Sequence, residues 1–129
     1  MANKILFVRL NETVGYLDVD DSGNGNQIPH GENDTITWEL AGDAANGYFN
    51  AMNAGTPGFE WRQSPPSGVF GTPVLQANGN QIQISDDNTT DGSSGTWVYQ
   101  LSATIDGVSY TTQTAGLGGT FTNPTIQNK

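Results

Sequence analysis

Residues 93–114 decide the fold, and they read SSGTWVYQLSATIDGVSYTTQT. Large apolar side chains alternate here with smaller or polar ones. This period of two is typical of a β-strand buried on one face, because successive side chains of a strand point to opposite sides of the sheet. The predicted inner face carries Trp97, Tyr99, Leu101, Ala103 and Ile105, and the outer face carries Val98, Gln100, Ser102 and Thr104.

Asp106-Gly107 follows this strand and predicts a tight hairpin, because both residue types tolerate the positive φ of a type I′ turn. The chain then returns through Val108, Tyr110 and Thr112. Residues 93–114 are therefore predicted to form an antiparallel hairpin. Its aromatic and aliphatic face needs a second sheet to cover it.

Other short stretches are also predicted to be strands, and turn-forming residues separate them. The predicted strands are Ile5–Leu10, Val14–Val19, Thr35–Leu40, Phe59–Arg62, Gln81–Ser85, a last short strand within Gly118–Ile126, and an edge strand at Val69–Gln76 that Gly71 and Pro73 interrupt. Asn78-Gly79 indicates a second hairpin. Loops are predicted at Asp20–Gly31, 41–58 and 86–95. The predicted core contains Ile5, Phe7, Leu17, Ile36, Trp38, Leu40, Ile82, Ile84, Trp97, Tyr99, Leu101 and Tyr110.

No stretch shows the 3.6-residue period of an amphipathic helix. With 129 residues, the chain has the usual size of one domain. We therefore predict one all-β domain over residues 1–129. Its expected architecture is a single immunoglobulin-like antiparallel β-sandwich of about seven to nine strands.

The charge of the chain excludes several classes of partner. The formal net charge at pH 7 is −9, and the positive charges are Lys4, Arg9, Arg62 and Lys129. Nucleic-acid binding needs clustered Lys and Arg, as does adhesion to an anionic membrane, so neither is expected. The chain has no cysteine, which excludes disulfides. The apolar run Ile5–Val8 is too short for a signal peptide, so a cytoplasmic protein is expected.

One acidic segment matches the opening of a calcium-binding loop. Asp18, Asp20 and Ser22 occupy the first, third and fifth positions, and Gly23 occupies the sixth. However, Pro29 stands where a calcium loop supplies a bidentate Glu, and the flanking segments are predicted strands. A solvated turn-forming loop is therefore the favoured interpretation. Calcium binding is the alternative.

A second acidic segment contains Asp86, Asp87 and Asp91 at the end of a predicted strand. It has the same two interpretations, a turn whose side chains bond their own backbone or a set of calcium ligands. No cofactor other than calcium is expected. The chain lacks a nucleophile elbow and a phosphate-binding loop, and no pair of carboxylates stands out for glycoside hydrolysis. An enzyme is therefore not expected.

Aromatic residues in the middle of the chain suggest a ligand-binding platform. Trp61 with Arg62, or Tyr48 with Phe49, could stack against sugars among the many Asn, Gln and Thr residues. For Trp61 the favoured interpretation is a core residue, because Phe59 lies on the same face of the strand, and the platform is the alternative.

The second half of the chain resembles the small bacterial proteins of the DP-EP family. The resemblance rests on Phe70–Pro73, Gly95–Leu101, Asp106-Gly107 and Asn123–Lys129. It implies an immunoglobulin-like β-sandwich and no catalytic residue, and the family is functionally uncharacterised. Asn123-Pro124 stands where an Asp-Pro would fit the family better.

Together these features predict a non-enzymatic binding or assembly module whose partner is an unknown protein or a glycan. The module could form a homo-oligomer through a sheet face or through the edge at Val69–Gln76, because edge strands offer unpaired backbone groups. The alternative is a lectin-like, carbohydrate-binding sandwich whose acidic loops bind calcium.

Overall fold

The predicted hairpin is present and organises one of two sheets. Strand β9 (Gly95–Ile105) pairs antiparallel with β10 (Val108–Thr111). Between them, Asp106 and Gly107 have φ values of 51° and 80°, as the Asp-Gly turn requires. The inner face of β9 is buried, as its alternation predicted, but Gln100 and Ser102 of the predicted outer face are buried as well. The long-range pairing of the sheet is therefore built around an element that the local sequence encodes.

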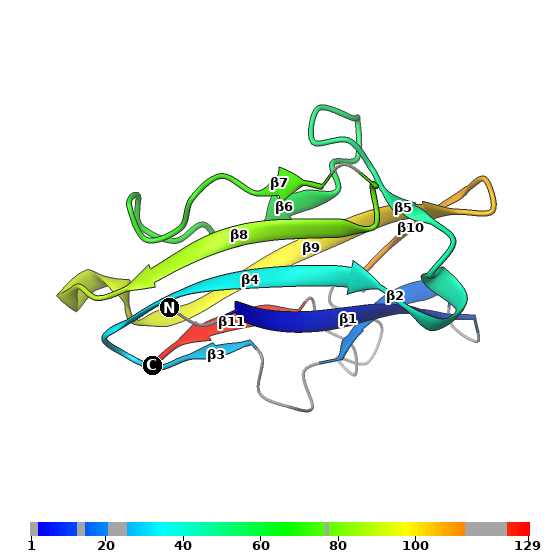
Figure 1. The fold of residues 1–129 in the computed structure, drawn as a ribbon. Coiled ribbons are helices and arrows are strands. Elements are labelled where there is room, and N and C mark those ends of the chain that lie inside the picture. The colour runs from blue at the N-terminus through cyan, green and yellow to red at the C-terminus, as the bar shows by residue number, and fades with distance from the viewer. Residues whose placement is uncertain (1–2, 13–14, 21–25, 77, 113–123) are drawn as a thin grey trace, which may run out of the picture.

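The computed structural model describes residues 3–12, 15–20, 26–76, 78–112 and 124–129. The strands in these ranges form two sheets that pack face to face (Figure 1). The first sheet has the order β2 (Tyr16–Asp20), β1 (Asn3–Asn11), β4 (Glu32–Leu40), β8 (Gln81–Asn88), β7 (Val74–Leu75). The second has the order β10, β9, β11 (Thr125–Asn128), β3 (Gln27–Ile28). Two further strands, β5 (Tyr48–Phe49) and β6 (Phe59–Trp61), also pair with β9.

The all-β sandwich prediction is confirmed, but its details differ. The described residues form eleven strands, which is more than predicted, because β3 and β5 lie in segments predicted to be loops. Both sheets are mixed, since β1 runs parallel to β4 and β3 runs parallel to β11. The predicted hairpin at Asn78-Gly79 joins β7 and β8, with Gly79 at φ 80°.

The predicted orientation of β1 is wrong. Leu6 and Val8 are buried, whereas Ile5 and Phe7 are 48% and 38% exposed. The run from Ile5 to Val8 is entirely apolar, so the sequence contains no alternation that could fix which face is inward. The structure decides the question through pairing, because Leu6 lies beside the buried Trp38 of β4.

Aromatic rings fill one part of the core between the sheets. The Trp38 ring lies 5.0 Å from that of Tyr99, and its Nε1 donates a 2.8 Å hydrogen bond to the Tyr99 hydroxyl. Phe59 stacks on Tyr99 at 5.4 Å. Trp61, Phe70 and Trp97 continue the contacts at centroid distances of 5.0, 4.9 and 5.8 Å. This cluster ties β4 of the first sheet to β6 and β9 of the second.

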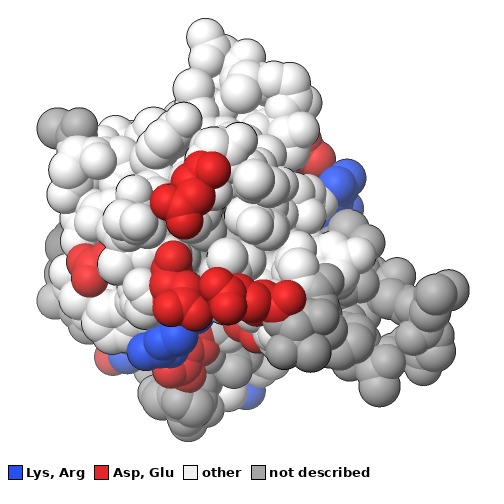
Figure 2. Space-filling model, turned by 90° about the vertical axis from the view of Figure 1, so that its right-hand side faces the viewer, with Lys and Arg blue, Asp and Glu red and all other residues white. Residues whose placement is uncertain are grey.

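Acidic side chains gather at one end of the sandwich. Figure 2 views the end that carries the 3₁₀ turn η1 (Gly42–Ala44) and the β9–β10 turn, and acidic groups outnumber basic ones there. Asp43 and Asp106 are exposed on these two turns. Among the described residues, no helix has the length and apolar character needed to cross a membrane.

Candidate binding face

The outer surface of the first sheet carries three rows of side chains that cross the strands. We call this surface the outer face. Strands lie about 4.8 Å apart, and alternate residues of one strand about 6.7 Å apart, so the rows form a regular grid. The first row is Phe7, Glu39, Gln81 and Gln76; the second is Ile5, Thr37, Gln83 and Val74; the third is Asn3, Thr35 and Ser85. Thr37 is buried within its row, and its hydroxyl donates a 3.2 Å hydrogen bond to Asn3 Oδ1.

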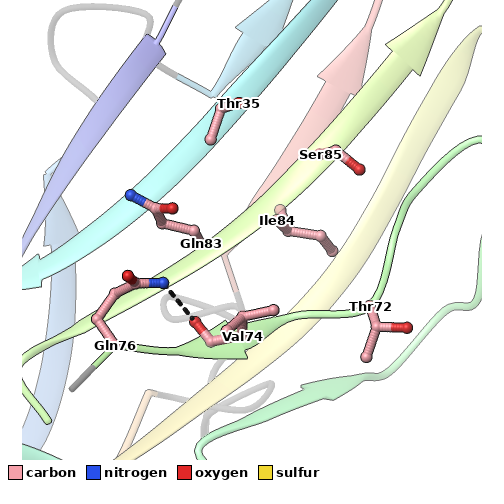
Figure 3. A pocket seen from close by; sticks show the side chains of 7 residues that line it. All are labelled: Thr35, Thr72, Val74, Gln76, Gln83, Ile84 and Ser85. Atoms are coloured by element: carbon pink, nitrogen blue, oxygen red, sulfur yellow. Dashed lines mark hydrogen bonds between the residues drawn. The ribbon is translucent and has the colours of Figure 1, made fainter.

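A hollow of about 300 Å³ lies on this face, between β4, β8 and the segment before and within β7. Its lining residues are Thr35, Thr72, Val74, Gln76, Gln83, Ile84 and Ser85 (Figure 3). Figure 3 shows the side chains of Gln76 and Gln83 extending to the same side of β8. Gln76 Nε2 donates a 3.4 Å hydrogen bond to the carbonyl oxygen of Val74. The lining is thus made of hydroxyl, amide and aliphatic groups, without a charged side chain.

Gly71 lies in the wall of the hollow next to β8. Its N–H donates a 3.1 Å hydrogen bond to the carbonyl oxygen of Ser85. A Cβ atom at position 71 would collide with Ser85 Oγ, so the hydroxyl group of Ser85 would have to rotate to admit a larger residue. The glycine, which the sequence marked as a strand interruption, therefore keeps backbone contact with β8 beside the hollow.

Exposed apolar side chains lie on the same face as the hollow. Val74 is 54% exposed at the hollow itself, and Ile5 and Phe7 are exposed on β1, the strand next to β4. The Arg9 guanidinium lies 5.9 Å from the centre of the Phe7 ring and forms a 3.1 Å ion pair with Asp20. The outer face therefore combines polar side chains that can hydrogen-bond with apolar patches.

The two alternative platforms predicted for a ligand lie at different places along β9. Trp61 is half-buried and contacts Phe59 and Phe70, so the core interpretation holds for most of its ring. Arg62 donates from Nε to Gln100 Oε1 at 2.8 Å. Tyr48 is exposed, but it pairs with Thr104 of β9, whereas Trp61 pairs with Tyr99. Five positions of a strand separate these sites by about 17 Å.

The first set of predicted calcium ligands is engaged within β1 and β2. Asp18 Oδ2 accepts a 3.1 Å hydrogen bond from Asn11 Nδ2, and Asp20 forms the ion pair with Arg9. Ser22 lies outside the described residues. β2 stands three strands from β8 in the sheet, so about 14 Å separates this set from the second.

The second set of predicted ligands does not converge either. Asp86 and Asp87 belong to β8, so their side chains lie on opposite faces of the sheet. Asp86 is fully buried, whereas Asp91 is exposed in the 3₁₀ turn η2 (Asp91–Ser93). Among the described residues, no three His, Cys, Asp or Glu side chains are grouped so that they could hold a metal ion. Asp86 was predicted to lie in a loop and instead belongs to the core side of a strand.

Asp86 belongs to a buried polar network that joins the two sheets. Its Oδ1 accepts a 2.9 Å hydrogen bond from Asn128 Nδ2 of β11, and Asn128 also donates to the carbonyl oxygen of Ser93. Asp34 of β4 lies directly opposite Asp86 in the ladder and is also buried. Burial raises the pKa of Asp86 to about 6, and the neighbouring carboxylates Asp34 and Asp87 add to the rise while the Asn128 hydrogen bond opposes it.

The outer face itself was not predicted as a site. Its signal was present in the alternation of Gln81–Ser85 and of Thr35–Leu40, which places Gln83, Ser85 and Thr35 on the solvent side. However, only the pairing of β4 with β8, which are more than 40 positions apart, shows that these side chains share one surface.

Comparison with known proteins gives no match, either among family models or among curated proteins. The resemblance to the DP-EP family and the immunoglobulin-like topology that it implies stay predictions.

Proposed function

We propose that the protein is a non-enzymatic binding module and that its ligand binds on the outer face. The observation that carries the proposal is the hollow beside β7. It is lined by hydroxyl and amide side chains and flanked by the exposed Val74. Ligand sites combine apolar surface with a few polar groups that fix orientation, and the hollow has both.

The chemistry of the lining favours binding over catalysis. The hydroxyl groups of Thr35, Thr72 and Ser85 have no histidine or carboxylate beside them among the lining residues. A serine or threonine nucleophile needs such a base to be activated. The carboxyl group with the raised pKa, that of Asp86, is enclosed in the core instead.

The edge at β7 favours binding on the face rather than pairing with a second strand. The N–H of Gln76 donates to the carbonyl oxygen of Gln81 at 2.9 Å. Alternation along the antiparallel ladder then turns the N–H and C=O of Leu75 towards the open edge. Two positions earlier, Pro73 has no N–H to donate. β7 spans two residues, and short edges with proline resist strand addition.

The test is to probe a peptide array and a glycan array with three forms of the protein: the wild type, a Thr35→Arg/Gln83→Arg variant of the outer face, and a Gln63→Arg/Thr96→Arg control. Gln63 and Thr96 are exposed and belong to the region of the second sheet. We expect ligands of the wild type to be retained by the control and lost by the outer-face variant. Ligands retained by the outer-face variant, or no ligand on either array, would show the proposal to be wrong.

A further inference from the structure

We infer that the ligand held in the hollow of the outer face is a neutral oligosaccharide, an inference that rests on the proposed function. Sugar hydroxyls both donate and accept hydrogen bonds, and so do the hydroxyl and amide groups of the lining. The aliphatic surface of Val74 is available to the C–H face of a sugar ring, because this side chain is 54% exposed.

Most of the polar lining is available to a ligand. Among the polar lining residues, the side chain of Gln76 donates a hydrogen bond to the backbone of Val74. Within the part of the chain that the structure describes, no side-chain hydrogen bond is made by Thr35, Thr72, Gln83 or Ser85. A ligand with several hydroxyl groups could therefore bind without breaking contacts in the protein, apart from the long bond of Gln76.

The charge of the site selects a neutral ligand. The lining contains no Lys or Arg for a phosphate or an acidic sugar, and no Asp or Glu for a cation. The net charge of −9 adds repulsion against any polyanion. Two of the seven lining residues, Val74 and Ile84, are aliphatic, which is too few for a largely apolar molecule.

The grid of the outer face also suits an extended sugar chain. Neighbouring strands are about 4.8 Å apart, which is close to the length of one pyranose residue in an extended chain. A chain that crosses the strands would therefore place successive sugars over β7, β8 and β4, above Val74, Gln83 and Thr35, which all line the hollow. A peptide would instead be expected to pair with an edge, and the edge at β7 is poorly suited to that.

The experiment is calorimetric titration with a panel of neutral hexasaccharides, namely maltohexaose, cellohexaose, xylohexaose, mannohexaose and chitohexaose, and with an acidic oligogalacturonate. We expect at least one neutral chain to bind and the acidic chain not to bind. Gln83→Ala removes a hydrogen-bonding group and should weaken binding about three- to tenfold. The control Gln63→Ala should stay within about twofold of the wild type, since this exposed residue lies outside the lining.

Gln83→Glu serves as a second variant that keeps the size of the side chain if Gln83→Ala does not fold. The inference is wrong if no neutral chain binds, or if binding survives unchanged in the folded Gln83 variants. If no glycan binds but peptide ligands do, and the Thr35→Arg/Gln83→Arg variant loses those peptides, the proposed function stands and the oligosaccharide inference is wrong. If neither a glycan nor a peptide binds, both the proposed function and the oligosaccharide inference are wrong.

Discussion

Asp86 shows how a single carboxyl group makes stability depend on pH. It is fully buried and lies opposite Asp34, and its hydrogen bond to Asn128 links β8 to β11. Its Oδ2 and Asn128 Oδ1 are buried without a hydrogen-bond partner among the described residues. A proton on Asp86 would remove the buried charge and could be donated to such an acceptor.

The pH dependence follows from the direction of the pKa shift. Burial raises the folded-state pKa of Asp86 from 3.8 to about 6. The folded protein therefore binds this proton more tightly than the unfolded chain, and the stabilisation is complete below the unfolded value and is lost as the pH rises through about 6. We expect Asp86→Asn, which mimics the protonated group, to raise the free energy of unfolding at pH 7 by up to about 3 kcal/mol and to change it little at pH 4.

Urea unfolding of both proteins at pH 4, 5, 6 and 7 measures this difference. Asp43→Asn is the control, because it removes one exposed negative charge from η1. A gain for Asp86→Asn that is the same at all four pH values would contradict the assignment, as would an equal pH-dependent gain for Asp43→Asn.

The hydroxyl group of Tyr99 is expected to stabilise the aromatic cluster. It accepts the 2.8 Å hydrogen bond from Trp38 Nε1, and both side chains are completely buried. Tyr99→Phe keeps the ring but leaves the indole N–H without this acceptor, at a cost of about 1–3 kcal/mol. Chemical unfolding followed by tryptophan fluorescence checks the value. Tyr110→Phe, at a half-buried position on β10, is the matched control, and an equal effect there would rule out a special role for the buried bond.

At the scale of elements, the β9–β10 turn is expected to depend on Gly107. This residue has φ 80°, a conformation that residues with a Cβ atom adopt at a cost of about 1–2 kcal/mol. A Cβ atom at this position would have no described atom within 4 Å, so strain rather than collision sets the effect. We expect Gly107→Ala to lower the free energy of unfolding by about 1 kcal/mol. Gly92 is the control, because a Cβ atom there has equal space and the residue has no positive φ, so Gly92→Ala should hardly change stability. Thermal melts measure both variants, and an equal loss of stability in the two would contradict this reasoning.

Elements encoded locally were predictable from the sequence, and elements decided by long-range pairing were not. β9 and its turn needed only their own alternation and the Asp-Gly pair. β1 has four consecutive apolar residues, so the sequence could not show that Leu6 rather than Phe7 faces Trp38. The predicted loop at 86–95 loses its first three residues to β8, because pairing with β4 continues as far as Asn88.

The same distinction applies to the candidate site. The sequence identified residue types of known chemistry, such as the carboxylates and Trp61, but these side chains are separated or packed in the core. Gln83 and Thr35 carry no distinctive chemistry alone, and they become a surface when β4 and β8 pair. A site made of common polar residues on a sheet face therefore cannot be read from spacing along the chain.

At the scale of the whole molecule, repulsion between like charges is expected to lower stability at low salt. The net charge is −9, and lowering the ionic strength from 0.15 M to 0.01 M lengthens the screening distance from about 8 Å to about 30 Å. We expect the melting temperature to be lower at 0.01 M NaCl, by roughly a few degrees. A fall in melting temperature on adding salt would contradict this.

Calcium chloride at matched ionic strength is the control for these melts. We expect calcium chloride to raise the melting temperature no more than NaCl does, because the described acidic side chains do not converge on one cation. A larger shift with calcium would indicate specific binding to the folded state.

The parallel pairing of β3 with β11 bears on how the chain finds its fold. Gln27 pairs with Gln127, one hundred positions later in the sequence. Closing so long a loop costs chain entropy before any contact rewards it, and chains rich in such contacts fold slowly, in about milliseconds to seconds. β9 and β10 can meet early, since a turn of two residues joins them. The junction of β3 and β11 is therefore expected to form late, whereas the Asn128 contacts that enclose Asp86 need the pairing of β11 with β9.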